Sequence, residues 1–415
     1  MKKYFIKVLK ILIIVVCLVN STIVYGSNDN DEPSVYSDSA ILIDFKTGTV
    51  LYSKNSEDKM YPASTTKILT AIIAIEKCNL NEIVTVSKSS VSAIPEGYSS
   101  AYLSEGEQIS VKDLLTVFLV HSANDAGYVL AEHISGSIQE FANLMNEKAS
   151  EIGCKNTNFT NPSGIHDDNH YSTAHDLALI ARYCMTNSVF RNIVSQKTCT
   201  INATNKFGVR NYKNTNDLIN PTSKYYMEDC IGIKTGYTRQ AKNCLISSCL
   251  KNNLILICVV LGANPINNIE SSRYEDSINL FNYGYSNYSI KTFVKENDTV
   301  KNIEIKNGSK NANNLDLISK DALSGLIGNS DALPTPVVTL KSNISAPIAK
   351  GTVLGTVSYT SYGITYSSDL IAASDIEKND TTLIMLYIAL AFILIIILIV
   401  VLIFILIHKK NKKSL

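Results

Sequence analysis

Near its C-terminal end the chain carries an unbroken apolar run, from Leu383 to Ile407. A helix needs about 20 apolar residues to cross the hydrocarbon core of a bilayer, and this run is longer. Four lysines follow it within the last seven residues, and basic residues mark the cytoplasmic end of a membrane span. The sequence therefore predicts a transmembrane helix over residues 383–407 and a basic cytoplasmic tail over residues 408–415.

The N-terminal end has the layout of a secretory signal peptide. Lysines come first, an apolar stretch follows, and small residues lead to Gly26, after which cleavage is expected. A signal peptide over residues 1–26 and a C-terminal anchor together place the body of the chain outside the cytoplasm. The two ends hold eight lysines and no acidic residue, so the body is acidic although the whole chain carries +1. An acidic body argues against nucleic acid as a partner.

Cysteine and histidine usage gives no sign of a metal site. The nine cysteines form no CxxC pair and no Cys/His metal spacing, and the eight that remain after processing leave one or two disulfides open. Three histidines occur in GIHDDNHYSTAH, a polar, loop-like stretch without HExxH. We expect no metal ligands there.

Hydrophobic patterns divide the body into a larger mixed part and a smaller β-rich part. AILIDFKTGTVLYSKN predicts two strands around a turn, Thr66 to Lys77 predicts a buried helix, and NCLISSCLKNNLILICVVLGA predicts a core β-hairpin. Helical periodicity dominates residues 111–184. Beyond about Asn287, short alternating segments with Gly, Asn and Pro breaks replace it. We expect a catalytic domain over 33–285 and a small β-domain over 288–375.

The stretch PASTTK, directly before the buried helix, places Ser64 and Lys67 three residues apart. Residues at this spacing share a helix face, and Pro62 puts Ser64 near the first helical turn. Apolar neighbours should desolvate the lysine amine, which favours its neutral form and makes it a base for the serine hydroxyl. The pattern predicts a nucleophile and its base. A second Ser-x-x-Lys, at residues 56–59, carries two acids and no apolar helix, so we interpret it as solvated surface.

Ser122 and Asn124, in LVHSANDAG, lie at a break between two apolar helical stretches. A hydroxyl there can relay a proton to a leaving amine, and the asparagine amide can hold a substrate carbonyl. Both residue types also favour helix caps, and for this tripeptide alone the cap is the simpler interpretation.

Lys234, Thr235 and Gly236 follow an apolar strand in CIGIKTGYT. A strand lining a cleft would present the lysine and threonine to a substrate carboxylate, and the glycine would allow close backbone approach. The backbone N–H of Tyr237, with that of Ser64, can form an oxyanion hole. A rival Lys-Thr-Gly at residues 46–48 falls in a predicted hairpin turn and is interpreted as structural.

With these three elements in order, the chain resembles the D-alanyl-D-alanine carboxypeptidases, the low-molecular-weight serine penicillin-binding proteins of bacterial cell walls. The resemblance runs from about Ser39 to Ala373 and includes YPASTTKILTA, HSANDAGYVLAE, NPSGIHDDNHYSTAHDLALIARY, GIKTGYT and APIAKGTVLGTV. It implies an α+β fold, with an antiparallel sheet flanked by helices beside an all-helical lobe, a cleft between them, and a small C-terminal β-domain.

The resemblance also implies roles for the site residues. Ser64 would be the acyl-ester nucleophile and Lys67 its proton acceptor, Ser122 and Asn124 would serve proton relay and substrate positioning, and residues 234–236 would bind the terminal carboxylate. The implied substrates are peptidoglycan stem peptides ending in D-Ala-D-Ala, the implied covalent inhibitors are β-lactams, and no cofactor is needed.

Two other functions stay open on sequence grounds. A serine β-lactamase shares the acylation residues, although no Glu-x-x-Leu-Asn segment lies between Asn124 and Lys234. A non-catalytic module that binds β-lactams or wall fragments is the second alternative, and the complete set of catalytic residues disfavours it. The chain departs from the family in having Ala241-Lys242-Asn243 after the Lys-Thr-Gly strand and a spanning helix where an amphipathic anchor is frequent.

Overall fold

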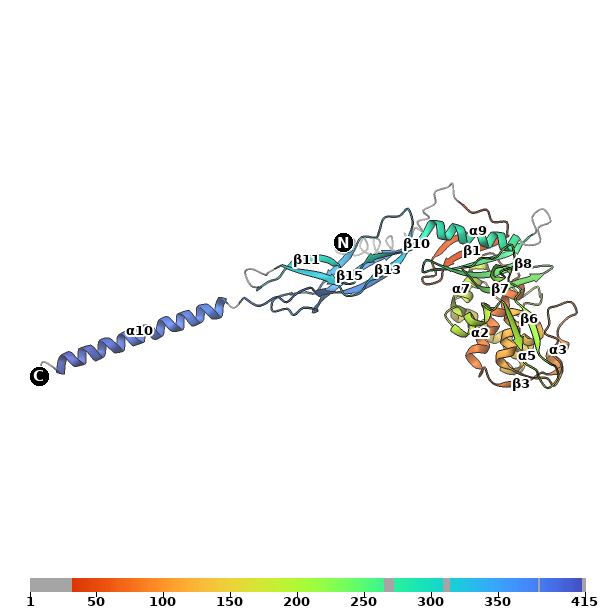
Figure 1. Cartoon of the computed structure of the whole chain (residues 1–415), viewed down its shortest axis with the longest axis horizontal. Coiled ribbons are helices and arrows are strands. Elements are labelled where there is room, and N and C mark those ends of the chain that lie inside the picture. Colours follow the sequence, from red (N-terminus) through yellow and green to blue (C-terminus); the bar gives the residue numbers. More distant parts are fainter. Residues whose placement is uncertain (1–31, 265–271, 309–313, 380, 413–415) are drawn as a thin grey trace, which may run out of the picture.

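The computed structural model describes residues 32–264, 272–308, 314–379 and 381–412. The predicted signal peptide lies outside these residues. In Figure 1 the parts follow one another along the length of the molecule: a mixed helix-and-sheet part, a group of strands, and a single long helix. This order matches the succession of patterns along the sequence.

An antiparallel sheet of five strands forms the centre of the larger part. The strand order is β2-β1-β9-β8-β7, so the two ends of this part of the chain meet in one sheet. The strands are β1 (Ser39–Asp44), β2 (Val50–Lys54), β7 (Cys230–Thr238), β8 (Lys242–Lys251) and β9 (Leu254–Ala263). The antiparallel sheet and both predicted hairpins are confirmed.

The sheet is buried on both faces, which explains the continuous apolar runs of its inner strands. Ile257 and Val259 of β9 point into one core, and Leu256 and Cys258 point into the other. Helix α9 (Ser272–Asn287) covers the second face through side chains such as Phe281. The other face packs against the helical lobe.

The helical lobe is built around α2, whose first eight residues are all buried. Its elements are η1 (Ala63–Thr66), α2 (Lys67–Lys77), α3 (Lys88–Ser92), α4 (Val111–Val120), α5 (Asn124–Ser135), α6 (Ile138–Ile152), α7 (Ala174–Cys184) and α8 (Ser188–Val194). The short helix η2 (Asp217–Ile219) packs instead into the core beneath α9. Gly153 ends α6 with φ +104°, as its C-cap position requires. Side chains of Ser110, Ser137 and Thr173 cap the N-termini of α4, α6 and α7.

Four short strands in the lobe were not predicted. They form the pairs β3 (Ile83–Thr85) with β4 (Gln108–Ser110) and β5 (Thr198–Ile201) with β6 (Arg210–Lys213). Each is three or four residues long, which is too short for an alternating pattern to show in the sequence.

The smaller part consists of strands around its own apolar core. A five-stranded sheet has the order β11-β12-β16-β15-β14, and β10 pairs with β13 beside it. Leu315, Leu317, Val357 and Leu370 are buried in this core. The strands are β10 (Tyr288–Val294), β11 (Thr299–Glu304), β12 (Asn314–Ser319), β13 (Leu323–Gly328), β14 (Val337–Leu340), β15 (Val353–Ser361) and β16 (Ile364–Ala372).

The chain ends in α10 (Thr381–Lys412). Within its segment Leu383–Lys409, the most apolar 18-residue window has a mean hydropathy of 3.9, and none of that window is buried inside the protein. By length and composition this helix can cross a membrane, and its exposed apolar surface needs a cover that the rest of the described chain does not supply.

Candidate active site

Ser64 lies on the turn that leads into the buried helix. It is the second residue of η1, which continues directly into α2, so the predicted position near the first helical turn is correct. The preceding Ala63 has φ +47°, an unfavourable value for a residue with a side chain. This conformation brings Ala63 O against the backbone of Gly164, where a Cβ would come within 1.8 Å of it.

Lys67 is fully buried and directs its amine at three oxygens. Its Nζ lies 2.8 Å from Ser64 Oγ, 2.7 Å from Asn124 Oδ1 and 2.8 Å from the carbonyl oxygen of Ser163. None of these partners is a carboxylate. Burial, and next the charge of Lys234, hold the pKa of Lys67 well below its usual value, and Asp125 opposes the shift. The neutral amine can donate to Asn124 and Ser163 and keep its lone pair for the Ser64 hydroxyl.

Asn124 is the first residue of α5 and is fixed at both ends of its amide. Its Oδ1 accepts from Lys67, while its Nδ2 and its backbone N–H each donate to the carbonyl of Ser99 over 2.8 Å. The helix-cap alternative is wrong, because the N-cap position is Ala123 and no side chain caps this helix. Instead, the Asn124 side chain accepts a hydrogen bond from Lys67.

Ser122 precedes the same helix and has φ +68°. The residue is 6 % exposed, and its hydroxyl makes no hydrogen bond to any residue that the structure describes. A non-glycine residue in this conformation costs about 1–2 kcal/mol, and such outliers gather at functional sites. The Ser122 hydroxyl is therefore available to form a hydrogen bond with a bound ligand.

Strand β7 forms the edge of the sheet and carries Lys234, Thr235 and Gly236. Lys234 is 1 % exposed and donates to the carbonyl of Thr235 over 3.0 Å. Burial, and next the charge of Arg273, lower the pKa of Lys234 to about 7. Thr235 Oγ1 lies 2.5 Å from Thr215 Oγ1. The site therefore holds two buried lysines, neither with a carboxylate partner, and the charge of Lys234 lowers the pKa of Lys67.

Gly236 joins the strand to the serine turn. A Cβ at Gly236 would lie 3.0 Å from Pro62 O and 3.1 Å from the backbone nitrogen of Ser64, so only a glycine fits without displacement. Tyr237 follows with a side chain that is 64 % exposed. The backbones of β7 and η1 thus meet where the sequence predicts an oxyanion hole.

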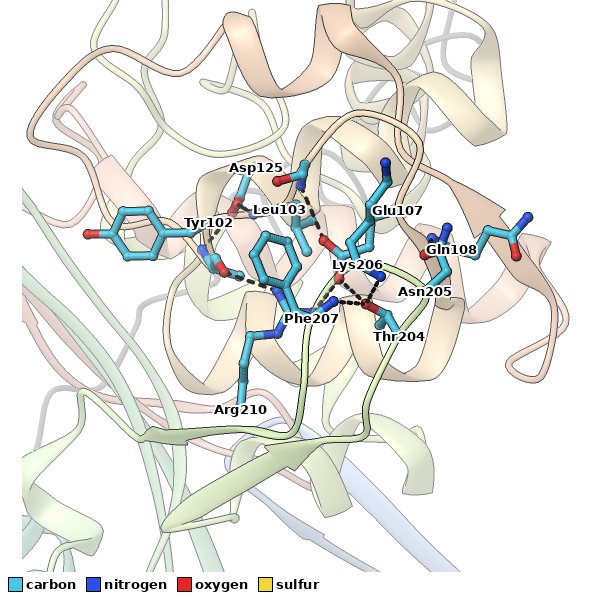
Figure 2. A network of polar contacts seen from close by, with 12 residues as sticks. Tyr102, Leu103, Glu107, Gln108, Asp125, Thr204, Asn205, Lys206, Phe207 and Arg210 are labelled. Atoms are coloured by element: carbon cyan, nitrogen blue, oxygen red, sulfur yellow. Dashed lines mark hydrogen bonds and ion pairs between the residues drawn. The ribbon is translucent and has the colours of Figure 1, made fainter.

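Figure 2 shows a network of polar contacts around Asp125, the residue that follows Asn124. Asp125 accepts hydrogen bonds from Ser100 Oγ (2.7 Å) and from the backbone nitrogens of Ala101 (2.9 Å) and Leu103 (3.0 Å). Between them Tyr102 has φ +55°, and its side chain is 80 % exposed. One buried carboxylate next to Asn124 therefore holds this turn in shape.

The same loop is tied to the turn between β5 and β6. Glu107, which is fully buried, forms an ion pair with Arg210 and accepts from Thr204 Oγ1 over 3.0 Å. Arg210 also donates to Ala101 O over 3.3 Å. The contacts link the β5–β6 hairpin, through this loop, to the start of α5.

His170 contacts the serine turn through a hydrogen bond to Thr66, the last residue of η1. Its Nδ1 accepts from the backbone N–H of Thr160 over 3.0 Å, so its Nε2 carries the proton and donates to Thr66 Oγ1 over 2.8 Å. Burial lowers the pKa of His170 to about 4, which keeps the ring neutral. His166 and His175 pair separately with Asp168 and Glu57, so the three histidines do not converge.

Sequence reasoning assigned no role to several residues around the site. Ser163 contributes its main-chain oxygen to Lys67, and no side-chain pattern signals such a contact. Arg273 donates to Gly236 O over 3.2 Å and lies over the Tyr274 ring, although it is 37 residues further along the chain than Gly236. Such long-range neighbours become visible only in the fold.

The rival sequence copies lie elsewhere. Thr47 and Gly48 form the β1–β2 turn, as predicted, with Thr47 bonded to Asp44. Ser56 is 7 % exposed and bonds Ser53, so its interpretation as solvated surface is wrong, while Lys59 is exposed. The serine is buried because the turn after β2 folds back onto the lobe.

A serine hydroxyl beside a fully buried lysine amine, on a turn that meets an edge strand with a second buried lysine, is the arrangement expected of an acyl-transfer enzyme of the penicillin-binding fold. Comparison with known proteins gives the family. Residues 27–265 match the peptidase S11 model, described as D-alanyl-D-alanine carboxypeptidase, and residues 288–378 match the penicillin-binding protein 5 C-terminal domain. Because the first match covers more than half of the chain, the chain belongs to the peptidase S11 family of D-alanyl-D-alanine carboxypeptidases.

Individual relatives agree with this. The D-alanyl-D-alanine carboxypeptidase DacF of Bacillus subtilis is 35 % identical over 343 residues, which is 81 % of this chain and 85 % of the relative. The solved penicillin-binding protein 5 of Haemophilus influenzae has a TM-score of 0.63 and 30 % identity, covering 84 % of this chain and 99 % of that structure. A solved mutant of the Streptomyces K15 DD-transpeptidase has a TM-score of 0.57 and 30 % identity, covering 61 % of this chain and 99 % of that structure.

Proposed function

We propose that this enzyme removes the terminal D-alanine from peptidoglycan stem peptides that end in D-Ala-D-Ala, through an acyl-enzyme on Ser64. The observation that carries the proposal is the fully buried Lys67 amine 2.8 Å from Ser64 Oγ. Membership of the peptidase S11 family supports the choice of substrate. β-Lactams would acylate the same serine.

Acylation begins with proton transfer from Ser64 to neutral Lys67. Ser64 Oγ then attacks the carbonyl carbon between the two D-alanines, and the backbone N–H groups of Ser64 and Tyr237 stabilise the oxyanion. Ser122 passes the proton from Lys67 to the leaving amine, while Asn124 holds the substrate amide. The terminal D-alanine leaves, a new ester joins the shortened peptide to Ser64, and water hydrolyses that ester with Lys67 again as base.

Lys234, Thr235 and Gly236 bind the terminal carboxylate in this proposal. The pKa of about 7 for Lys234 is that of a buried amine with no anion beside it. A bound carboxylate would favour the charged form and restore the ammonium. Substrate binding and the protonation of Lys234 are therefore coupled, so a peptide without a free C-terminal carboxylate should be a poor substrate.

The test compares Ser64 with the serine of the Ser-x-x-Lys copy at residues 56–59. Ser64→Ala is expected to abolish both labelling by fluorescent penicillin and release of D-alanine from a defined muropeptide. Ser56→Ala is the matched control and should retain both. D-alanine release by a folded Ser64→Ala enzyme would refute the assignment. Turnover of penicillin faster than of the peptide would favour a β-lactamase instead.

We further propose that α10 anchors the enzyme with its catalytic part outside the cytoplasm. The apolar segment Leu383–Lys409 and the family's C-terminal domain at residues 288–378 support an anchored enzyme of the penicillin-binding protein 5 type. The N-terminal signal layout and the lysines after Ile407 support this orientation. Domain boundaries at 33–285 and 288–375 belong to the same proposal.

The orientation can be tested with protease on intact protoplasts that carry the full chain with a C-terminal epitope tag. The catalytic part is expected to be degraded, while the tagged tail stays protected inside. A tag that is lost while the catalytic part survives would reverse the orientation. A protein released by salt washing alone would rule out a spanning helix.

A further inference from the structure

Two cysteines face each other at the start of the strand that carries Lys234. Cys230 is the first residue of β7, and the strand register places Cys249 of β8 directly opposite it. Cys249 is fully buried and Cys230 is 8 % exposed. Both side chains point into the same apolar core, beneath α9.

The hydrogen bonds around the pair show which kind of cross-strand position it is. The backbone N–H of Leu250 donates to the carbonyl of Asp229 over 2.9 Å, so the ladder bond joins the residues that flank the cysteines. Opposed residues of this non-hydrogen-bonded kind have Cα atoms about 4.5 Å apart and the closer side chains. A disulfide requires Cα atoms about 4.4 to 6.8 Å apart, so the backbone already suits one.

No other pair among the eight cysteines that the structure describes is placed this way. Cys258 lies on the same sheet face, but it faces Ser247, while Cys249 faces Leu256 on that side. Cys258 is thus a diagonal neighbour, and diagonal neighbours are roughly 7 to 8 Å apart. Cys244 faces Gly236 on the opposite face of the sheet.

The two thiols are also close enough to affect one another electrostatically. Burial raises the pKa of the Cys249 thiol, and the neighbouring Cys230 thiol is the second cause of this shift. Cys230 Sγ itself donates to the carbonyl of Gly232 over 3.2 Å. Two thiols therefore lie on facing strands in the same apolar core, which places them for a bond between them.

We propose that Cys230 and Cys249 form a cross-strand disulfide when the chain folds under oxidising conditions. The oxidant is a second disulfide, of a small thiol compound or of a protein thiol oxidoreductase. One cysteine thiolate attacks a sulfur of that disulfide, forms a mixed disulfide and releases the first thiol of the oxidant. The second cysteine thiolate then attacks the sulfur of the first cysteine and releases the remaining thiol of the oxidant. The S–S bond of the oxidant breaks, one S–S bond forms in the enzyme, and the oxidant leaves as two thiols with both protons. The extracytoplasmic location proposed above matters only for the supply of oxidant.

The position of the bond indicates what it would do. The β7–β8 ladder is irregular between Cys230 and Ile233, immediately before Lys234. A covalent link at Cys230 would hold the first residue of β7 in register beyond this irregularity. It lies outside the cleft, so we expect an effect on the melting temperature and little effect on kcat.

The experiment refolds the full chain in detergent with oxidised and reduced glutathione, blocks free thiols by alkylation, and maps peptides without reduction. We expect a linked peptide joining Cys230 and Cys249, and a protein two hydrogens lighter than the reduced form. Reduction should lower the melting temperature on the order of 5–10 °C. Cys258→Ser should keep the link, and Cys249→Ser should lose it.

Alkylation of both Cys230 and Cys249 in the refolded wild-type enzyme would overturn the proposal, as would a link between any other cysteines. D-alanine release is measured on the same sample. An active enzyme without the link refutes the disulfide alone. A linked enzyme that labels with penicillin but releases no D-alanine refutes the proposed function alone.

Discussion

Two regions of this chain carry the same short sequences and differ in almost everything else. The β1–β2 hairpin and the turn after it contain one Lys-Thr-Gly and one Ser-x-x-Lys, and the walls of the cleft contain another of each. In the hairpin region, Lys59 is exposed and its Nζ lies 4.2 Å from the Tyr171 ring centroid. In the cleft, Lys67 is fully buried among three oxygens. Lys59 is solvated, whereas burial holds the pKa of Lys67 well below its usual value.

The two Lys-Thr-Gly copies differ in the same way. Lys46 lies on the turn with its Nζ 6.0 Å from the Tyr366 ring centroid, so it contacts the smaller β-rich part of the protein. Lys234 is 1 % exposed and lies on a strand that touches the serine turn. One copy shapes a turn, and the other lies on the strand that we propose binds the substrate carboxylate. Residue spacing is shared, so the chemistry must come from burial and from the elements that face each copy.

The largest expected difference is between Lys67 and Lys59, the lysines of the two Ser-x-x-Lys copies compared above. Lys67→Met removes the base and should reduce penicillin acylation about 10³-fold. Lys59→Met removes an exposed amine and should leave the rate within about twofold. The measurement is the acylation rate with a fluorescent penicillin, with circular dichroism as the check on folding. Equal losses in the two variants would mean that burial does not distinguish them.

The second expected difference is between the two Lys-Thr-Gly lysines. Lys234→Ala should lower kcat/KM for a D-Ala-D-Ala peptide about 10²-fold, because a buried charge-assisted contact to the carboxylate is lost. Lys46→Ala should leave kcat/KM unchanged. A C-terminal amide version of the peptide is the control substrate, and on it Lys234→Ala should lose much less. A loss of the same size on both peptides would contradict the carboxylate role.

Much of this arrangement could be predicted because the decisive signals are local. The apolar stretch after PASTTK predicted the burial of Lys67, and the break in LVHSANDAG predicted that Ser122 and Asn124 lie between helices. The structure adds what no local pattern carries. The carbonyl of Ser163 is offered by the main chain, and Arg273 reaches Gly236 through the fold. Ser56 was misjudged for the same reason, since its two acidic neighbours suggested exposure and tertiary packing buries it.

The pH profile should separate the two cleft lysines from each other. Lys67 must be neutral to act as base, so kcat/KM should fall about tenfold per pH unit below its lowered pKa. Lys234 must be charged to bind a carboxylate, so kcat/KM should fall again as the pH rises through about 7. Lys234→Arg keeps its charge at high pH and should move only the alkaline limb upward. Lys46→Arg should move neither limb, and an alkaline limb that stays in place in Lys234→Arg would assign it to another group.

The smallest expected effects concern the two glycines of the Lys-Thr-Gly copies, and they should differ in kind. Gly48 has φ +77°, and the nearest atoms to an added Cβ belong to the flexible end of the Arg182 side chain. Gly48→Ala should therefore cost about 1 kcal/mol of folding free energy, or roughly 2–4 °C in melting temperature, with kcat/KM within about twofold. Gly236 does not need a positive φ, but its Cβ would press on backbone atoms of Pro62 and Ser64 at 3.0 and 3.1 Å.

Gly236→Ala should therefore lower kcat/KM about tenfold. A shift of a few tenths of an ångström between β7 and the serine turn would separate the N–H of Tyr237 from Ser64. Thermal melts and peptide kinetics on both variants provide the comparison. A Gly236→Ala enzyme with full activity would show that β7 and the serine turn can separate without cost. In that case the contact between strand and turn would serve folding, as the hairpin copy does, and the orientation of Ser64 would depend on Lys67 and Asn124 alone.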